Sequence, residues 1–265
     1  MKWVRYESDG KTFYGILTGS SVREVYGTPF DAYTVSETIH SYENIHLLAP
    51  VIPPTFYAAG VNYETHVREA AALLGREPNI PQKADIGYRA VNAIIGQDDP
   101  IVIPSDATGK VQYEGELVVV IGKEAKYLTE ENALDCVLGY TVGNDVSERS
   151  WQASDRTLWR AKNTDTFKPM GPWIETDADL DEMVTTVRLN GRELISFPTN
   201  DMIFGVQKYI SEMTKYMTLY PGDVIWMGTD GAAENMKPGD ICEVEISGVG
   251  TLRNPIIGTD DEKYC

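Results

Sequence analysis

The stretch that most constrains the fold is YEGELVVVI at residues 113–121, where two acidic side chains precede an unbroken apolar run. The run predicts a β-strand. In an extended strand, residues two apart point to the same face, so Glu114 and Glu116 project together, about 7 Å apart along the backbone. Two carboxylates on one face of such a strand are costly unless something positive neutralises them.

A second apolar run, GYTVG at residues 139–143, leads into Asn144 and Asp145. Asp145 lies at the mouth of this second predicted strand, where it would supply a third oxygen ligand. Three carboxylates without cysteine or clustered histidine suit a hard divalent cation such as Mg²⁺ or Mn²⁺. The alternative is a strand edge with solvated acids, which is common in a chain this acidic.

The charge balance limits the classes of partner. The 265-residue chain has 40 acidic and 23 basic residues and a formal net charge of −17. This balance disfavours binding to nucleic acid and to anionic membranes, since both need positive potential on the protein, but it leaves a small anionic substrate possible where cations gather.

No apolar run approaches the roughly 20 residues that span a bilayer. The start, MKWVRY, lacks the apolar core of a signal peptide, and three widely spaced cysteines argue against a disulfide framework. We therefore expect a soluble cytoplasmic protein.

The first fifty residues have the pattern of a small β unit. Apolar runs at 3–6 and 12–17 flank Asp9-Gly10, which is a hairpin signal. The connector LAPVIPP follows at residues 48–54. We therefore expect a small N-terminal β domain over 1–52 and a larger catalytic domain over 53–265.

The larger part is predicted to be mostly strands interrupted by helices. One helix is expected from Thr129 to Leu138, with Thr129 as its cap and Gly139 as its end. Another is expected over 202–217, because its apolar residues form one helical stripe. Residues 258–265 are predicted to form a loose polar tail.

A further predicted helix, over 62–75, carries a histidine and a glutamate on one face. Asn62 is its expected cap and Gly75 its expected end. His66 lies three residues before Glu69, so both side chains share a face. A histidine held by a carboxylate is oriented and more basic, which suits a general base acting on water. The alternative is an ordinary surface pair.

Several sequence blocks between residues 55 and 257 occur in the order of a known family. GVNYETHVRE at 60–69 resembles the G-x-N-Y-x-x-H-x-x-E opening of the fumarylacetoacetate hydrolase superfamily. Five later stretches of this chain resemble the later blocks of the same family. They are YEGELVVVIGK (113–123), GNDVS (143–147), KNTDTF (162–167) followed by Gly171-Pro172, LYPGDVI (219–225) through Gly228-Thr229, and GTLRNP (250–255).

The resemblance implies a mixed β fold (α+β) with several packed sheets and few helices. This is the multi-sheet β-roll of the family's C-terminal domain, preceded here by a small N-terminal β domain. It also implies a homodimer. The implied ligands of Mg²⁺ or Mn²⁺ are Glu114, Glu116 and Asp145.

The resemblance also implies roles for other side chains. His66 and Glu69 would form a water-activating dyad on a mobile helical lid. Lys162 would face the substrate's carboxylate or enolate oxygen. The implied substrate contacts are Gln152, Thr229 and Arg149, with a structural salt bridge as the alternative for Arg149.

The activity implied by the resemblance is hydrolysis of a carbon–carbon bond in an acylpyruvate-type diketo acid, such as fumarylpyruvate or maleylpyruvate. The products would be pyruvate and a carboxylic acid. The competing activities are decarboxylation of an oxaloacetate-like acid and isomerisation of a 2-hydroxydienoate, which use the same metal-chelated enolate. A catalytically silent metal-binding or oligomerisation module needs none of His66, Glu69 and Lys162, so their presence argues against it.

The chain departs from the family pattern at three places near the expected substrate, one of them PTNDM at 198–202 in place of the family's Asn-Thr-Ser-Asp-Met. The family often has Phe-x-Lys-Pro-x-Ser where this chain has GYRAVN at 87–92. Arg89 in that run would engage a distal carboxylate of the substrate, or else it is an exposed arginine. Proline usually follows Gly-Thr, whereas this chain has Asp230.

Overall fold

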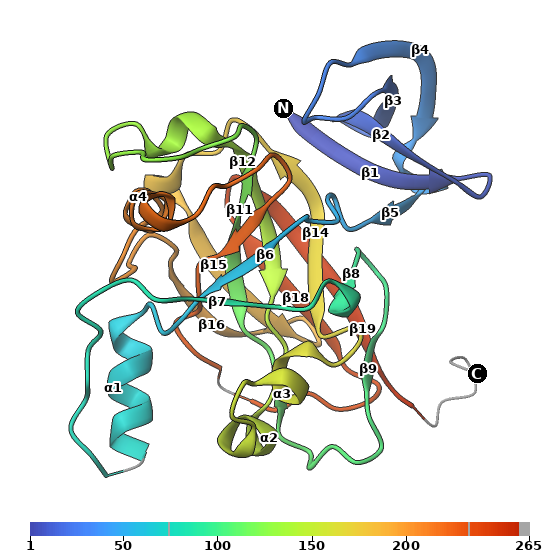
Figure 1. The fold of residues 1–265 in the computed structure, drawn as a ribbon. Coiled ribbons are helices and arrows are strands. Elements are labelled where there is room, and N and C mark those ends of the chain that lie inside the picture. Colours follow the sequence, from blue (N-terminus) through green and yellow to red (C-terminus); the bar gives the residue numbers. More distant parts are fainter. Residues whose placement is uncertain (74, 233, 260–265) are drawn as a thin grey trace.

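Strands dominate the structure, and four α-helices lie within its described part (Figure 1). The computed structural model describes residues 1–73, 75–232 and 234–259. Its strands form several sheets, so the predicted mixed β fold with few helices is confirmed.

The largest sheet has 12 strands in the described part of the chain. Its main path is, in order, β4 (Thr34–Ser41), β3 (Ser21–Tyr26), β2 (Lys11–Thr18), β1 (Lys2–Ser8), β14 (Lys168–Glu175), β12 (Val137–Asn144), β11 (Gly115–Ile121), β17 (Val224–Trp226), β6 (Phe56–Ala59) and β7 (Ile86–Tyr88). Off this path, β1 also pairs with β5 (His46–Leu48), and β14 also pairs with β8 (Ile94–Ile95).

Two smaller sheets complete the β structure of the described residues. The larger of them runs in the order β16 (Arg192–Pro198), β15 (Val184–Leu189), β18 (Ile241–Ile246), β19 (Gly250–Gly258) and β9 (Ile101–Ile103). The other pairs β10 (Val111–Gln112) with β13 (Ser147–Glu148).

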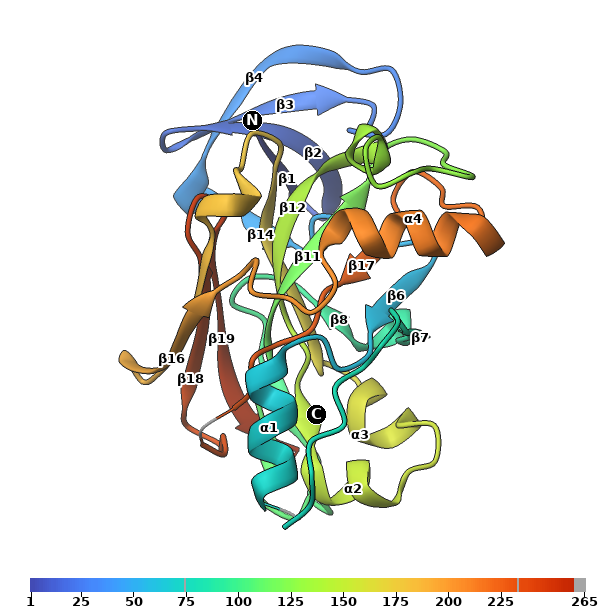
Figure 2. The same ribbon diagram turned by 90° about the vertical axis from the view of Figure 1, so that its left-hand side faces the viewer.

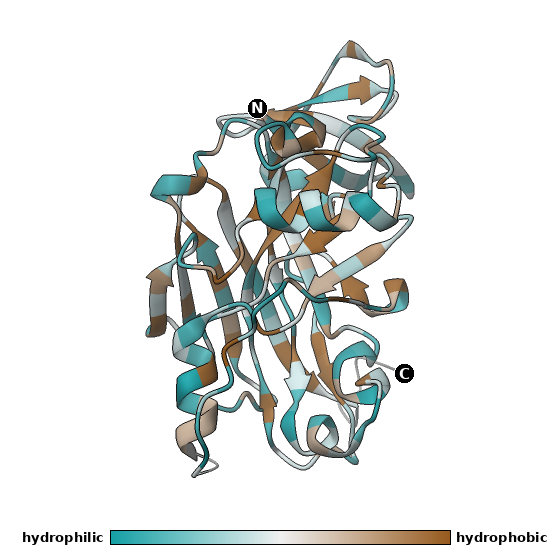
Figure 3. Ribbon diagram, turned by 60° about the vertical axis from the view of Figure 1, so that its left-hand side comes forward, coloured by the Kyte–Doolittle hydropathy of each residue, from teal (hydrophilic) through white to brown (hydrophobic). Residues whose placement is uncertain are grey.

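Strand β11 is buried on both faces, which explains its unbroken apolar sequence. Leu117, Val119 and Ile121 belong to the core shared with the five-stranded sheet. Val118 and Val120 belong to a second core on the opposite face. Figure 3 shows hydrophobic residues concentrated along these inner strands.

The N-terminal strands share the main sheet with the rest of the chain. The β1–β2 hairpin turns at Asp9 and Gly10, whose φ angles of 51° and 70° are those of a primed turn, so the predicted hairpin is confirmed. β1 pairs with β14 through Trp3 and Ile174, and Figure 2 shows β1–β4 at one end of the molecule. The division at residues 52 and 53 stays a prediction.

The helices are α1 (Glu64–Leu73), α2 (Arg149–Ser154), α3 (Trp159–Asn163) and α4 (Val206–Tyr216), with 3-10 turns η1 (Tyr42–Asn44), η2 (Val91–Ala93), η3 (Ala133–Cys136) and η4 (Leu180–Glu182). None of the described helices is long and apolar enough to cross a bilayer. The tail predicted at 258–265 lies outside the described residues from 260 onward.

The helix predicted from Thr129 to Leu138 is wrong. Only η3 is helical there, and Val137 already begins β12. The carbonyl of Cys136 accepts the N–H groups of Gly122 and Lys123, which joins this segment to the end of β11. Pairing with β11 therefore overrides the local helix signal.

The predicted starts of the other two helices need correction. The helix predicted from 202 begins at Val206, because Gly205 before it has extended backbone. Asn62 is not the cap of α1, which begins at Glu64. Its buried side-chain amide instead donates to the carbonyls of Phe204 and Met227 and accepts from the N–H of Phe204, so Asn62 ties the entrance of α1 to two loops.

Candidate active site

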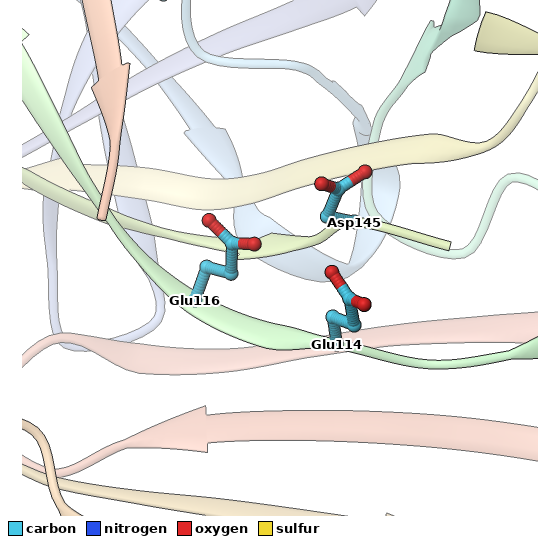
Figure 4. A group of neighbouring side chains, drawn as sticks. All are labelled: Glu114, Glu116 and Asp145. Carbon is cyan, nitrogen blue, oxygen red and sulfur yellow. The ribbon is translucent and has the colours of Figure 1, made fainter. Parts of the chain in front are cut away.

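Strand pairing brings three carboxylates together at one end of β11 and β12. Gly115 pairs with Asn144, and the N–H of Asp145 donates to the carbonyl of Glu114 at 2.9 Å. One oxygen each from Glu114, Glu116 and Asp145 lies within 4.8 Å of the others, and Figure 4 shows the three groups converging. We call these three residues the carboxylate triad. Their exposed fractions are only 6%, 4% and 1%, so the alternative of solvated acids at a strand edge is wrong.

Cationic side chains surround two members of the triad. Nζ of Lys162, from α3, donates to Glu114 at 2.7 Å and to Asp145 at 2.9 Å. The guanidinium of Arg149, at the start of α2, hydrogen-bonds the other oxygen of Glu114. That of Arg89 donates to Asp145 at 3.0 Å.

Lys168 is a further cation of the site that the sequence analysis missed. It is fully buried in β14, and its Nζ lies 2.6 Å from Oδ1 of Asp145. The same ammonium donates to the carbonyls of Val146 at 3.0 Å and Phe167 at 2.7 Å. A lysine within the otherwise apolar run FKPM was the available sequence signal, because a buried lysine almost always has a charged partner.

The three carboxyl groups differ in how readily they ionise. Burial alone would raise the pKa of Glu114, but Lys162 and Arg149 outweigh it and lower that pKa to about 2. Burial likewise opposes ionisation of Asp145, and Arg89, Lys162 and Lys168 hold its pKa well below the usual range. Burial raises the pKa of Glu116 to about 8, and the charges of Asp145 and Glu114 add to the shift.

The triad fits a hard divalent cation. Its ligand atoms are all carboxylate oxygens, the donor type that Mg²⁺ and Mn²⁺ prefer. Glu116 forms no ion pair with any described residue, and the N–H of Gly228 donates to it at 2.8 Å. The ionised form of a buried carboxylate with two charged neighbours and no ion-pair partner is unfavourable, and a bound cation would offset that cost. The predicted acidic cluster is confirmed, while its metal remains to be identified.

A cavity of about 190 Å³ opens beside the triad. Besides the three carboxylates, the predicted site residues in its lining are His66, Arg89, Gln152, Lys162 and Thr229. His66 comes from α1, Gln152 from α2, Lys162 from α3 and Thr229 from the loop after β17. Elements far apart in the sequence therefore meet at one small space.

The remaining predicted residues lie around this cavity. Arg149 binds Gln112 at 2.7 Å and Gln152 at 2.8 Å, in addition to Glu114. Glu69 is exposed on α1. The side chain of Arg89 is only 10% exposed, so the alternative of an exposed arginine is wrong. The functional roles predicted for these residues stay predictions.

Comparison with known proteins identifies both parts of the chain. Residues 55–257 match the family model described as fumarylacetoacetate (FAA) hydrolase C-terminal. Residues 1–50 match the model described as Rv2993c-like, N-terminal.

Relatives of this chain are named for different activities. The mitochondrial oxaloacetate tautomerase fahd2 of Xenopus laevis is 36% identical over 243 residues, which cover 87% of this chain and 74% of that protein. A 2,4-didehydro-3-deoxy-L-rhamnonate hydrolase of a Sphingomonas species is 36% identical over 211 residues, which cover 75% of this chain and 72% of that protein. The crystal structure of 5-carboxymethyl-2-hydroxymuconate delta-isomerase from Mycobacterium smegmatis matches with a TM-score of 0.88 at 32% identity, covering 98% of this chain and 100% of that one.

Proposed function

Because the chain belongs to the fumarylacetoacetate hydrolase family, we propose that it is a divalent-metal-dependent hydrolase of an acylpyruvate-type diketo acid. It would cleave a carbon–carbon bond in a substrate of the fumarylpyruvate or maleylpyruvate type and release pyruvate and a carboxylic acid. The observation that carries the proposal is that His66 lines the same small cavity as the carboxylate triad. A base for water and a site for a cation would thus face the same substrate.

The triad residues would hold Mg²⁺ or Mn²⁺. A divalent ion there supplies Lewis-acid stabilisation of the negative charge that develops on the oxygens of a 2-oxo acid. Lys162 adds a second positive charge beside Glu114 and Asp145, where that anion develops. His66, assisted by Glu69, accepts a proton from the attacking water. Gln152, Thr229 and Arg149 would orient the substrate, and Arg89 would stay beside Asp145.

The second candidate is tautomerisation or isomerisation of a 2-oxo acid, with decarboxylation as a related reaction. The names of the Xenopus and Mycobacterium relatives favour it, since both describe proton shifts rather than hydrolysis. Such reactions use the same stabilised enolate, but they need no activated water.

The test is turnover of a panel of acylpyruvates, followed by loss of their ultraviolet absorbance and by enzymatic detection of pyruvate. Activity should require Mg²⁺ or Mn²⁺ and disappear with a chelator. Oxaloacetate tautomerisation, assayed in parallel, would instead establish the second candidate. Absence of chelator-sensitive turnover with every substrate would favour a catalytically silent module.

Replacing His66 separates the two candidates. We expect His66→Ala to slow hydrolysis by about 100-fold or more, the usual contribution of a general base. A tautomerase that needs no activated water would retain its activity in this variant. The proposed homodimer is measured by light scattering during size-exclusion chromatography, and the proposed cytoplasmic location by cell fractionation.

A further inference from the structure

The cavity has cations only beside the carboxylate triad. Among the described residues that line it, Arg89 and Lys162 are the two lysine or arginine side chains, and both bind Asp145. Arg89 uses Nε and Nη2 for Asp145, and its Nη1 donates to the carbonyl of Tyr88. Its hydrogen-bonding groups are therefore committed to the triad end.

The rest of the described lining is neutral apart from His66. It consists of Ala59, Gly60, Val61, Asn62, Gln152, Leu158, Gly228 and Thr229. The amide of Asn62 is fully engaged with the backbone of Phe204 and Met227, so it is not available to a ligand. This part of the cavity offers apolar surface and neutral polar groups, without a fixed positive charge for a second carboxylate.

Acidic side chains lie next to His66. The loop after Thr229 packs on the dyad, because a Cβ added to Gly231 would lie 3.3 Å from Nδ1 of His66 and 3.9 Å from Oε2 of Glu69. Asp230 precedes Gly231 and is half-buried. Burial raises the pKa of Asp230, the negative charge of Glu69 raises it further, and His66 opposes the shift.

We propose that the substrate is an acylpyruvate whose acyl group is small and uncharged, and that Asp230 is a specificity-determining residue that disfavours a second carboxylate. This inference rests on the proposed hydrolysis of an acylpyruvate, and it replaces the dicarboxylic substrates named there, fumarylpyruvate and maleylpyruvate, by one with a neutral acyl end. The 1-carboxylate and 2-oxo group lie at the triad, and the neutral acyl end faces His66. The volume of about 190 Å³ suits a short acyl group.

The reaction balances without another reactant. The hydroxyl of water bonds to the acyl carbonyl carbon, and the bond between that carbon and the neighbouring methylene breaks. The electron pair of the broken bond stays on the methylene carbon, which takes the second proton of the water and becomes the methyl group of pyruvate.

The test compares acetylpyruvate, which has a neutral acyl group, with fumarylpyruvate, which carries a second carboxylate. Binding to the manganese-loaded protein is measured by calorimetry, and turnover is measured separately. We expect both the affinity and kcat/KM to favour acetylpyruvate by at least about tenfold. We expect Asp230→Asn to reduce this preference about tenfold, because the unit charge is removed from a poorly screened site. Added salt should reduce the wild-type preference more than that of the variant.

Controls distinguish the possible failures. Glu212→Gln should leave the preference unchanged, because Glu212 pairs with Lys208 and Lys215 and does not line this cavity. Asp230→Ser replaces Asp230→Asn if the latter melts early. Equal or better binding of fumarylpyruvate by the wild type would overturn the inference, as would an equal effect of Asp230→Asn on both compounds. Preferred binding of acetylpyruvate without its turnover would instead reject the hydrolase function and support the charge preference.

Discussion

Each carboxyl of the triad has a different set of partners, and this difference decides how it responds to mutation. Glu114 and Asp145 are both hydrogen-bonded to Lys162, and each has a further arginine. Glu116 is hydrogen-bonded to the backbone N–H of Gly228. A bound divalent ion would therefore matter most to Glu116, whose negative charge is otherwise opposed by burial and by its two neighbours.

We expect Glu116→Gln to weaken metal binding and to stabilise the metal-free protein. Two unit charges about 4 Å apart interact by about 4 kcal/mol at an effective dielectric constant of about 20. Since about 1.4 kcal/mol corresponds to a factor of ten, Mn²⁺ affinity measured by calorimetry should fall by about 100-fold or more. The melting temperature without metal should rise, because glutamine has the shape of glutamate without the charge that burial disfavours.

The matched control is Glu175→Gln. Glu175 is similarly buried, at 7% exposed, but it pairs with the N-terminal ammonium of Met1 at 2.7 Å. Its replacement should lower the melting temperature and leave Mn²⁺ affinity unchanged. Unaltered Mn²⁺ affinity in Glu116→Gln would remove this residue from the metal site.

Lys168 should contribute more to stability than any surface lysine. Lys168→Met removes the ammonium from Asp145 and leaves the carbonyls of Val146 and Phe167 without this donor. Asp145 keeps Arg89 and Lys162, so the expected cost is the loss of one buried charge-assisted contact and of the donor to the two carbonyls, about 1–3 kcal/mol. Urea unfolding followed by tryptophan fluorescence measures this loss.

Lys208→Met is the comparison for this prediction. Lys208 pairs with Glu130 and Glu212, but its side chain is 38% exposed. An exposed ion pair contributes at most about 1 kcal/mol. Similar losses of unfolding free energy in Lys168→Met and Lys208→Met would show that burial gives Lys168 no special role in stability.

At the scale of elements, Gly115 sets the distance between the two principal sheets. A Cβ at this position would lie 2.8 Å from Cγ2 of Val187 and 2.9 Å from Cγ1 of Val244. Gly115→Ala should therefore destabilise the protein by about 1–3 kcal/mol through overpacking. It should also weaken Mn²⁺ binding, because the backbone that moves lies between Glu114 and Glu116.

A second substitution tests this explanation. Val187→Ala removes one of the two methyl groups that the new Cβ meets most closely, so the double variant should regain part of the stability lost in Gly115→Ala. Chemical denaturation of the four proteins of this cycle gives the coupling energy. If the losses of unfolding free energy in the two single variants simply add in the double variant, the contact between residues 115 and 187 does not cause the destabilisation.

Local patterns predicted the strands and the face shared by Glu114 and Glu116, because both follow from the two-residue period of a strand. The approach of Asp145 depends on the register that pairs Gly115 with Asn144, which one sequence does not reveal. The contact of Lys168 with Asp145 likewise depends on strand pairing, since it needs β12 and β14 side by side. The segment from Thr129 failed as a helix because pairing of Val137 with β11 overrides local propensity.

At the scale of the whole molecule, the N-terminal strands and the rest of the chain share a sheet and a core. Trp3 is 3% exposed and lies in one cluster with Met170, Ile174 and Trp226. Its ring also meets Tyr33 edge to face, with centroids 4.8 Å apart. The apolar contacts of the N-terminal unit thus continue into the core on which β11 packs.

We therefore expect the chain to unfold as one cooperative unit, although residues 1–52 are predicted to form a domain of their own. Trp3→Ala should cost about 3–5 kcal/mol, the usual loss for a large buried aromatic residue. In both the wild type and this variant, urea transitions monitored by fluorescence and by far-ultraviolet circular dichroism should coincide. Tyr26→Ala, at a side chain 62% exposed on β3, should change stability little. Two separate transitions, with Trp3→Ala shifting only the first, would contradict this prediction and show that the shared sheet does not couple the two parts.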